Sequence, residues 1–280
     1  MRLMPLQNRL NLAKAYFSST RDFPISWVAV AAGVVRPRCT QLGRRFISAI
    51  SEQGDHLVVH IRSLKSPLYW PKEYPLFDLY KVVTEAFCED DWHFYEVPET
   101  RVERGDVVLD CGAAEGIFAL RVQDRAARIV AFEPLPRFVT SMRQTFADDP
   151  NVSVVPEALG SAEGEAVLAG DSLYGCVVNR GQGTPIRITT IDRWVQKTGS
   201  RIDFIKGDLE SFEMNVLRGA ADTIRKYQPK IAFTVYHPGN NWLEMLSYVR
   251  NLVPGYKHRI KGISYNGAKA RPVMLHLWAK

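Results

Sequence analysis

The 280-residue sequence has few cysteines and no apolar run long enough to cross a membrane. Its four cysteines are scattered and form no Cys-x-x-Cys pair, which argues against a zinc module and a disulfide scaffold. The first apolar run, residues 23–35, would make a helix of about 20 Å, against about 30 Å of hydrocarbon in a bilayer. Arg36 and Arg38 follow this run where a signal peptide would have small residues at a cleavage site. We therefore expect a cytoplasmic protein.

Acidic residues are absent from the C-terminal end of the chain. From position 250 onward there is no Asp or Glu, while the basic residues are Arg250, Lys257, Arg259, Lys261, Lys269, Arg271 and Lys280. Such a region can attract an acidic substrate, for instance a phosphorylated or lipid-linked one, or it can be a solvated surface without a partner. Together with the basic-flanked apolar run, it leaves peripheral contact with the inner face of a membrane open.

The apolar pattern divides the chain into two expected domains. Residues 1–99 are expected to form a small α+β appendage, with a helical arm to about residue 40, a hairpin made by RRFISAIS and DHLVVHIRS, and a helix over 76–87. Residues 100–280 alternate short apolar runs with helical stretches, which is typical of a doubly wound, mostly parallel sheet. The front segment is expected to shape the acceptor pocket or a subunit contact, so a homo-oligomer is possible.

Seven strands are expected in the larger domain, at 107–111, 128–132, 152–155, 202–206, 230–236, 257–262 and 273–278. Apolar residues recur every four positions in two of the helical stretches between them, at Phe138, Met142 and Phe146, and at Phe212, Val216, Ala220 and Ile224. In such a sheet the ligand crevice lies outside the carboxyl ends of the strands. We therefore look for a binding site close to the first expected strand.

The segment VVLDCGAAEGIFAL, residues 107–120, predicts a strand, a tight loop and a helix. Gly112 and Gly116 permit close approach of a ligand to the backbone. A dinucleotide site would have a third glycine here and no acid beside the pyrophosphate, whereas this loop carries Asp110 and Glu115. These acids suit a cationic ligand, which favours S-adenosylmethionine over NAD. The expected cofactor residues of the loop are Asp110, Gly112, Ala113, Ala114, Glu115 and Gly116.

Two later strand ends extend the expected adenosine site. Glu133 follows the second strand, 23 positions after Asp110, where an acid can bind both ribose hydroxyls. Pro134 comes directly after it. Glu157 and Ala158 follow the third strand, where a side chain and a backbone group could contact the adenine edge; an exposed turn acid is the alternative for Glu157.

The motifs taken together resemble the FkbM family of methyltransferases. The resemblance rests on VVLDCGAAEGIFAL, AFEPLP, VVPEALG, RITTIDRW, DFIKGDLESFEMNVLRGA and KIAFTVYHP, in this order between about residues 90 and 250. It implies a seven-stranded class I methyltransferase fold and methyl transfer from S-adenosylmethionine to a hydroxyl group of a saccharide, a glycolipid precursor or a secondary metabolite. It also implies that WHFYE, with Tyr95, covers the cofactor.

Two positions depart from the pattern of that family. The family usually reads K-x-D-x-E-G-x-E, and this chain has Ser211 in place of the glycine. Asn240 and Asn241 stand where the resemblance leads us to expect a pair of acids. Both departures lie on the expected acceptor side, so they leave the cofactor assignment intact and bear on the acceptor and on any metal.

The acceptor side requires a group that removes a proton from the acceptor hydroxyl. We expect His237 to be this general base, because an unperturbed imidazole titrates near neutral pH. Asp208 would orient the base, the acceptor or the cofactor, or it caps the following helix. Lys206 is a further candidate base, which would need a strongly lowered pKa. We expect no metal; the alternative is a divalent ion held by Asp208, Glu210, Glu213 and His237.

Two other function classes are weighed against the methyltransferase. An NAD-linked enzyme would require the missing third glycine, and a non-catalytic protein binding lipid or nucleic acid would not need Asp110, Gly112 and Glu133 together. Nucleic acid is not expected as a substrate, because KGDLES stands where a base-methylating enzyme would have an N-P-P-Y-type sequence. The aromatic residues Trp70, Tyr74, Trp92, Phe94 and Tyr95 form either a sugar platform or part of the core.

Overall fold

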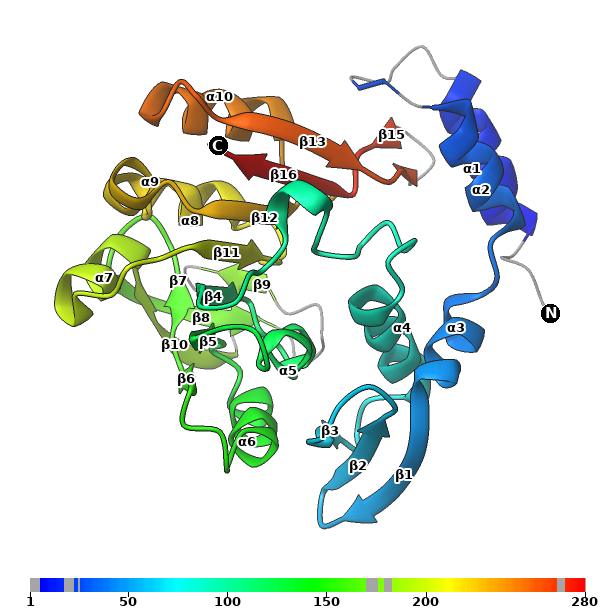
Figure 1. Cartoon of the computed structure of the whole chain (residues 1–280), viewed down its shortest axis with the longest axis horizontal. Helices are drawn as coiled ribbons and strands as arrows, with labels where there is room; N and C mark the ends of the chain where they lie inside the picture. Colours follow the sequence, from blue (N-terminus) through cyan, green and yellow to red (C-terminus); the bar gives the residue numbers. More distant parts are fainter. Residues whose placement is uncertain are drawn as a thin grey trace.

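The computed structural model describes residues 6–17, 23–24, 26–169, 176–178, 183–265 and 270–279. A seven-stranded sheet with the order β13-β16-β12-β11-β4-β5-β6 forms its centre (Figure 1). These strands are β4 Val107–Cys111, β5 Arg128–Phe132, β6 Val152–Val155, β11 Phe204–Gly207, β12 Lys230–Thr234, β13 Lys257–Lys261 and β16 Met274–Trp278. The expected seven-stranded doubly wound fold is confirmed. The pairing of β16 with both its neighbours is antiparallel, and the remaining pairs in the sheet are parallel.

The central strands are apolar because both faces of the sheet are covered. Alternate residues enter two separate hydrophobic clusters, so that Val108 packs on one side of β4 and Leu109 on the other. The first side is covered by α5 Ile117–Val122 and α6 Pro136–Thr145. The second is covered by α7 Ile191–Thr198, α8 Glu213–Arg218, α9 Ala221–Tyr227 and α10 Trp242–Leu252.

The front third of the chain packs against the first side of the sheet from residue 47 onward, whereas Leu12 and Phe23 belong to the cluster on the second side. Its elements are α1 Leu6–Phe17, α2 Trp27–Val35, α3 Cys39–Phe46, β1 Ile47–Gln53, β2 His56–Ile61, β3 Leu68–Pro71, α4 Leu76–Phe87 and the 3-10 helix η1 Pro98–Thr100. The hairpin β1-β2 and helix α4 occupy the expected positions. One hydrophobic cluster runs from Trp70 and Leu79 to Leu120 and Phe138. The expected boundary at residue 99 stays a prediction, but the two parts share a core.

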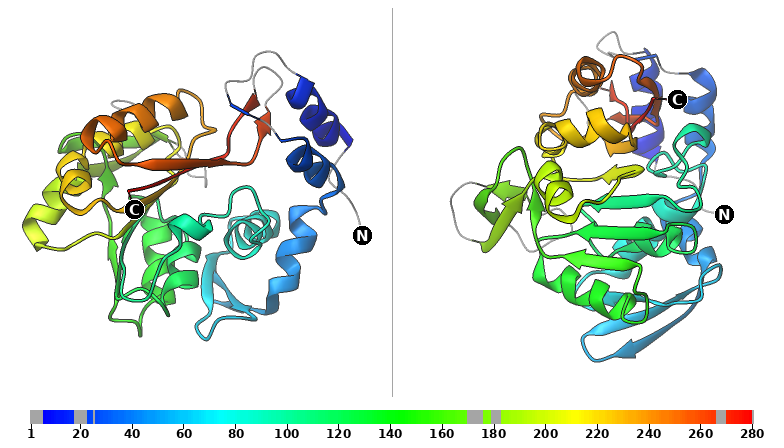
Figure 2. Two further views of the ribbon diagram at one scale, coloured as in Figure 1. Left: turned by 45° about the horizontal axis from the view of Figure 1, so that its top comes forward. Right: turned by 60° about the vertical axis from the view of Figure 1, so that its left-hand side comes forward.

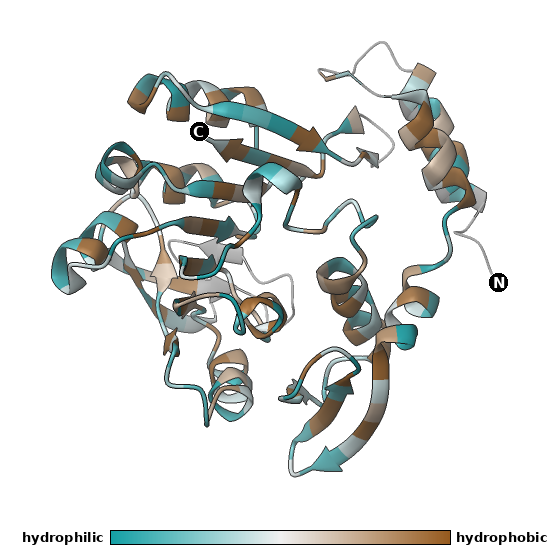
Figure 3. Ribbon diagram, viewed as in Figure 1, coloured by the Kyte–Doolittle hydropathy of each residue, from teal (hydrophilic) through white to brown (hydrophobic). Residues whose placement is uncertain are grey.

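Helices α1 and α2 lie at the outer end of the molecule (Figure 2). Trp27, Val28 and Val35 of α2 are exposed, and Figure 3 shows the apolar character of this helix. Among the residues that the structure describes, no helix is long and apolar enough to cross a membrane. Contact of the front segment with a membrane surface stays a prediction.

A second, smaller sheet was not anticipated from the sequence. It has the order β7-β10-β8-β9 and consists of β7 Ala158–Leu159, β8 Gly164–Ala169, β9 Cys176–Val178 and β10 Thr184–Thr189. Its strands are short, and β10 alternates buried Ile186 with exposed Arg187. A two-stranded ribbon of β14 Ser264–Tyr265 and β15 Ala270–Arg271 completes the described strands.

The apolar repeat from Phe212 to Ile224 predicts one helix, and this is wrong. The chain forms α8 and α9 instead, with a break at Gly219 and Ala220. The carbonyl of Gly219 accepts a hydrogen bond from the backbone N–H of Asp192. A Cβ at Gly219 would lie 2.0 Å from the carbonyl oxygen of Gly160. This close packing against a distant segment interrupts the helix, which the local sequence pattern does not reveal.

Candidate active site

A cavity opens at the carboxyl ends of β4, β5 and β11. Its empty volume, which includes the open space at its mouth, is about 1260 Å³. Most of the residues singled out from the sequence line it: Tyr95, Gly112, Ala113, Ala114, Glu115, Glu133, Pro134, Glu157, Ala158, Lys206, Asp208 and Glu210. The others, Asp110, Gly116, Glu213 and His237, are not among the residues that line it.

The loop after β4 turns sharply because of two glycines with positive φ. Gly112 has a φ of 70° and Gly116, which precedes α5, a φ of 84°. A Cβ at Gly112 would lie 2.0 Å from the backbone carbonyl oxygen of Asp208. Only glycine therefore lets the loop after β4 approach the loop after β11 this closely.

Glu133 braces this loop from the end of β5. Its carboxylate accepts hydrogen bonds from the backbone N–H groups of Ala114, at 2.9 Å, and Leu135, at 2.8 Å. Burial raises the pKa of Glu133 to about 7, although these two N–H donors favour the ionised form. The carboxyl group is thus fixed in place and still faces the cavity.

Glu115 presents a buried oxygen without a partner. The side chain is 3% exposed, and its Oε2 has no hydrogen-bond partner among the described residues. Burial raises the pKa of Glu115 to about 8. Buried polar atoms usually have a partner, so this oxygen points to a group that the site is built to receive.

Lys206 is held inside an ion pair. Its Nζ lies 3.0 Å from Asp110 Oδ1 and donates a hydrogen bond of 2.6 Å to the carbonyl oxygen of Gly112. Burial opposes the charge, but the carboxylates of Asp110 and Asp208 outweigh it and raise the pKa of Lys206. A base would need the neutral amine, so this geometry supports Lys206 as a cation that positions the loop and not as the base.

Asp208 is the centre of the polar contacts on the acceptor side. Its Oδ2 accepts a hydrogen bond of 2.7 Å from the hydroxyl of Tyr95 and lies 3.6 Å from His93 Nε2. Burial raises its pKa, but His93, His237 and Lys206 together hold the pKa of this carboxyl well below its usual range. Asp208 is therefore an ionised acceptor of hydrogen bonds at the wall of the cavity.

His237 does not have the properties expected of a general base. It is buried, it does not line the cavity, and its Nδ1 lies 2.8 Å from Glu213 Oε1. Burial favours the neutral ring, but the hydrogen bond to Glu213 and the charges of Asp208, Glu213 and Glu210 raise the pKa of His237 to about 9. In the ligand-free protein the imidazole is therefore protonated at neutral pH. The structure places it as a support for the carboxylates.

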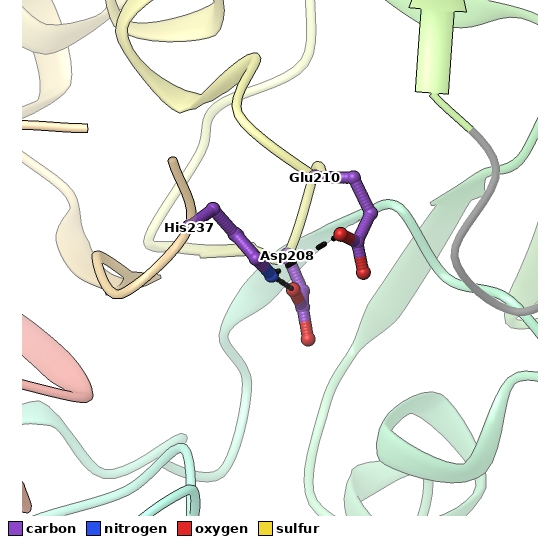
Figure 4. A group of neighbouring side chains, drawn as sticks. All are labelled: Asp208, Glu210 and His237. Carbon is purple, nitrogen blue, oxygen red and sulfur yellow. Dashed lines mark ion pairs between the residues drawn. The ribbon is translucent and has the colours of Figure 1, made fainter. Parts of the chain in front are cut away.

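The loop after β11 has an unusual backbone. Glu210 and Ser211 have φ values of 47° and 85°, in the left-handed region that favours glycine. This explains why a glycine suits the position of Ser211, which a glycine would occupy without strain, but not why this chain has a serine there. Each such residue costs on the order of 1 kcal/mol, a cost that recurs at functional sites. The strained turn directs Glu210 toward His237 and Asp208 (Figure 4).

Several residues of the cavity were not singled out as site residues from the sequence. Lys81 and Glu85 of α4 line it, as do His93 and Tyr236, whose side chains lie 3.4 Å apart. Helix α4 carries no motif that marks it as part of a site. Among the five aromatic candidates, Trp70, Tyr74 and Phe94 are buried, Trp92 is half-buried, and Tyr95 is the one that lines the cavity.

The family model of the methyltransferase FkbM domain matches residues 110–257, more than half of the chain. The chain belongs to the FkbM methyltransferase family. The matched range contains the glycine loop, Glu133, Asp208 and His237, whereas Lys81, His93 and Tyr95 precede it.

One solved structure supports the fold of this FkbM methyltransferase, and two others are more distantly similar. The methyltransferase FkbM from Methylobacillus flagellatus superposes with a TM-score of 0.51 at 17% identity, over 86% of this chain and 58% of that one. The chain therefore spans little more than half the length of that relative. Trm5b from Pyrococcus abyssi has a TM-score of 0.46 at 14% identity, over 81% and 57% of the two chains. Fibrillarin from Aeropyrum pernix has a TM-score of 0.42 at 11% identity, over 82% and 98%. No curated protein sequence matches the chain.

Proposed function

We propose that this FkbM methyltransferase transfers a methyl group from S-adenosylmethionine to a hydroxyl group of a polar acceptor, such as a saccharide or a hydroxylated secondary metabolite. One observation carries the proposal: a single cavity joins the glycine loop and Glu133 to Asp208 and Glu210. The glycine loop and Glu133 suit an adenosine-containing cation, whereas Asp208 and Glu210 suit hydroxyl groups that donate hydrogen bonds. A donor and an acceptor can therefore meet in one enclosed space.

The residues of the loop after β4 fit S-adenosylmethionine. Glu133 has a carboxylate facing the cavity for the ribose hydroxyls, and the unpartnered Oε2 of Glu115 suits a positively charged group of the donor. Gly112 keeps the backbone accessible, and Glu157 and Ala158 line the same cavity for the adenine. When bound, S-adenosylmethionine supplies a methyl carbon that its sulfonium group activates toward displacement.

The acceptor side must align one oxygen with that carbon. Asp208 is ionised and fixed by Tyr95, so it can accept a hydrogen bond from an acceptor hydroxyl and orient it. His93 and Tyr236 stand beside it at the wall of the cavity. In the transfer, the acceptor oxygen would bond to the methyl carbon as the carbon–sulfur bond breaks, and the hydroxyl proton would pass to the carboxylate of Asp208 or Glu210, which line this side of the cavity.

Calorimetry with S-adenosylmethionine tests the donor half of the proposal. We expect saturable binding to the full chain, and a loss of at least about tenfold in affinity for Glu133→Ala, because the ribose hydroxyls lose their acceptor. Glu165→Gln, an exposed acid on β8, is the matched control. Absence of binding to the folded wild-type protein would refute the proposal. Incubation with labelled donor and candidate hydroxylated acceptors, followed by mass spectrometry, then identifies the methylated product.

A further inference from the structure

Three side chains converge on one point beside the cavity (Figure 4). His237 Nε2 lies 3.6 Å from Asp208 Oδ1 and 3.5 Å from Glu210 Oε2. These separations are longer than a good hydrogen bond. They do suit neighbouring ligands of one divalent ion, which lie roughly 3 to 4 Å apart when each is about 2.0 to 2.3 Å from the metal.

The nitrogen of His237 that faces the two carboxylates has no hydrogen-bond partner among the described residues. The side chain is only 4% exposed, so water does not freely replace that partner. The other ring nitrogen, Nδ1, lies 2.8 Å from Glu213 Oε1. A carboxylate behind a histidine is the usual support of a metal ligand, because it keeps a proton on Nδ1 while a cation displaces the proton on Nε2 and binds its lone pair.

Glu213 belongs to this support and not to the ligand set. It is fully buried, its Oε1 lies 3.0 Å from Thr234 Oγ1, and its Oε2 accepts a hydrogen bond of 2.8 Å from the amide of Asn240. Both oxygens are thus occupied. The four-residue set considered in the sequence analysis is thereby reduced to Asp208, Glu210 and His237.

We propose that Asp208, Glu210 and His237 bind a divalent cation of the Mn²⁺ or Mg²⁺ type through two carboxylate oxygens and one imidazole nitrogen. Asp208 and Glu210 line the cavity, so the cation would keep coordination positions open toward the acceptor. A cation in this place lowers the pKa of a bound hydroxyl group and orients it. The proposal goes beyond the proposed function, since cation binding at these residues requires no methyl donor.

Titration with Mn²⁺ alone tests this site. The full chain is treated with chelator, dialysed and titrated with MnCl₂, with free Mn²⁺ followed by electron paramagnetic resonance and heat by calorimetry. We expect one bound ion per chain, and an affinity at least about tenfold weaker in Glu210→Gln and in His237→Gln. The exposed acid variant Glu165→Gln should bind like the wild type. Far-ultraviolet circular dichroism checks that each variant is folded.

Two results would overturn the proposal. One is the absence of saturable Mn²⁺ binding to folded wild-type protein. The other is binding that Glu210→Gln and His237→Gln leave unchanged, since the ion would then lie elsewhere. Binding of S-adenosylmethionine is measured in a separate titration without metal. Failure of the cation site can therefore be told apart from failure of the methyltransferase assignment.

Discussion

The buried carboxyl group of Glu133 should make folding stability fall as the pH rises from 5 to 8. Burial raises its pKa to about 7 in the folded chain, from an ordinary value of 4.5. The folded state therefore holds this proton more tightly than the unfolded state. The stability it provides is complete below pH 4.5 and is lost as the pH rises through 7. The difference corresponds to about 3 kcal/mol.

Urea denaturation of the ligand-free protein between pH 5 and pH 8 measures this effect. Glu133→Gln keeps the size of the side chain and one oxygen that can accept an N–H bond, but it cannot ionise. We expect the wild type to lose about 2.5 kcal/mol more than Glu133→Gln between pH 5 and pH 8, because the unfolded chain is already partly ionised at pH 5. Glu115, whose pKa burial raises to about 8, contributes a further fall that both proteins share. The exposed control Glu165→Gln should follow the wild type.

The slope of the free energy of unfolding against pH, compared between the wild type and Glu133→Gln, decides the outcome. If wild type and Glu133→Gln lose stability in parallel between pH 5 and 8, the side chain does not hold a proton in the folded state, and the reasoning from burial is wrong. A uniform offset between the two curves is no support, because it reflects only the altered hydrogen bonds to the backbone.

Three further predictions concern stability. Ser211→Gly should raise the melting temperature by about 2 °C, because it relieves the strain of a φ of 85°. The control Ser161→Gly, at a position without positive φ, should lower the melting temperature. Equal changes in the two variants would contradict the prediction. Glu96→Gln should cost about 3 kcal/mol in urea denaturation, since it leaves two arginines facing a neutral group in a buried ion cluster. Asn240→Asp should lower the free energy of unfolding by about 2 kcal/mol at pH 8, because a carboxylate replaces the amide that donates a hydrogen bond to the buried Glu213. Asn241→Asp, at the N-cap of α10, should lower it by less than about 0.5 kcal/mol.

Local patterns predicted the parts of the structure that depend on neighbouring residues. The runs 107–111 and 128–132 are apolar because both faces of their strands are buried, and the structure has strands with these bounds. The residues of the cofactor loop could be predicted equally well, since Gly112 and Glu133 each directly follow a strand. The carboxyl ends of adjacent parallel strands meet at one edge, so these residues lie together without any long-range information.

Charge states and distant contributions could not be predicted in the same way. The role expected for His237 rested on an ordinary pKa and that for Lys206 on a lowered one, whereas nearby carboxylates outweigh the effect of burial and raise the pKa of both. Lys81 and Glu85 reach the cavity because α4 packs against the sheet, which no local motif records. The break between α8 and α9 has a similar origin, in a contact between two segments far apart in the sequence.

Both departures from the FkbM pattern lie around Glu213, and neither touches the cofactor loop. Ser211 adopts a left-handed backbone where a glycine would be unstrained, and it directly follows Glu210. Asn240 donates its amide to Glu213, so a neutral hydrogen bond stands where an acid would bring a second charge. Because Glu213 also contacts Nδ1 of His237, having Asn240 in place of an acid also affects the proton on His237. Neither Ser211 nor Asn240 lines the cavity, so both departures act on its wall through Glu210, Glu213 and His237 and leave the cofactor loop unchanged.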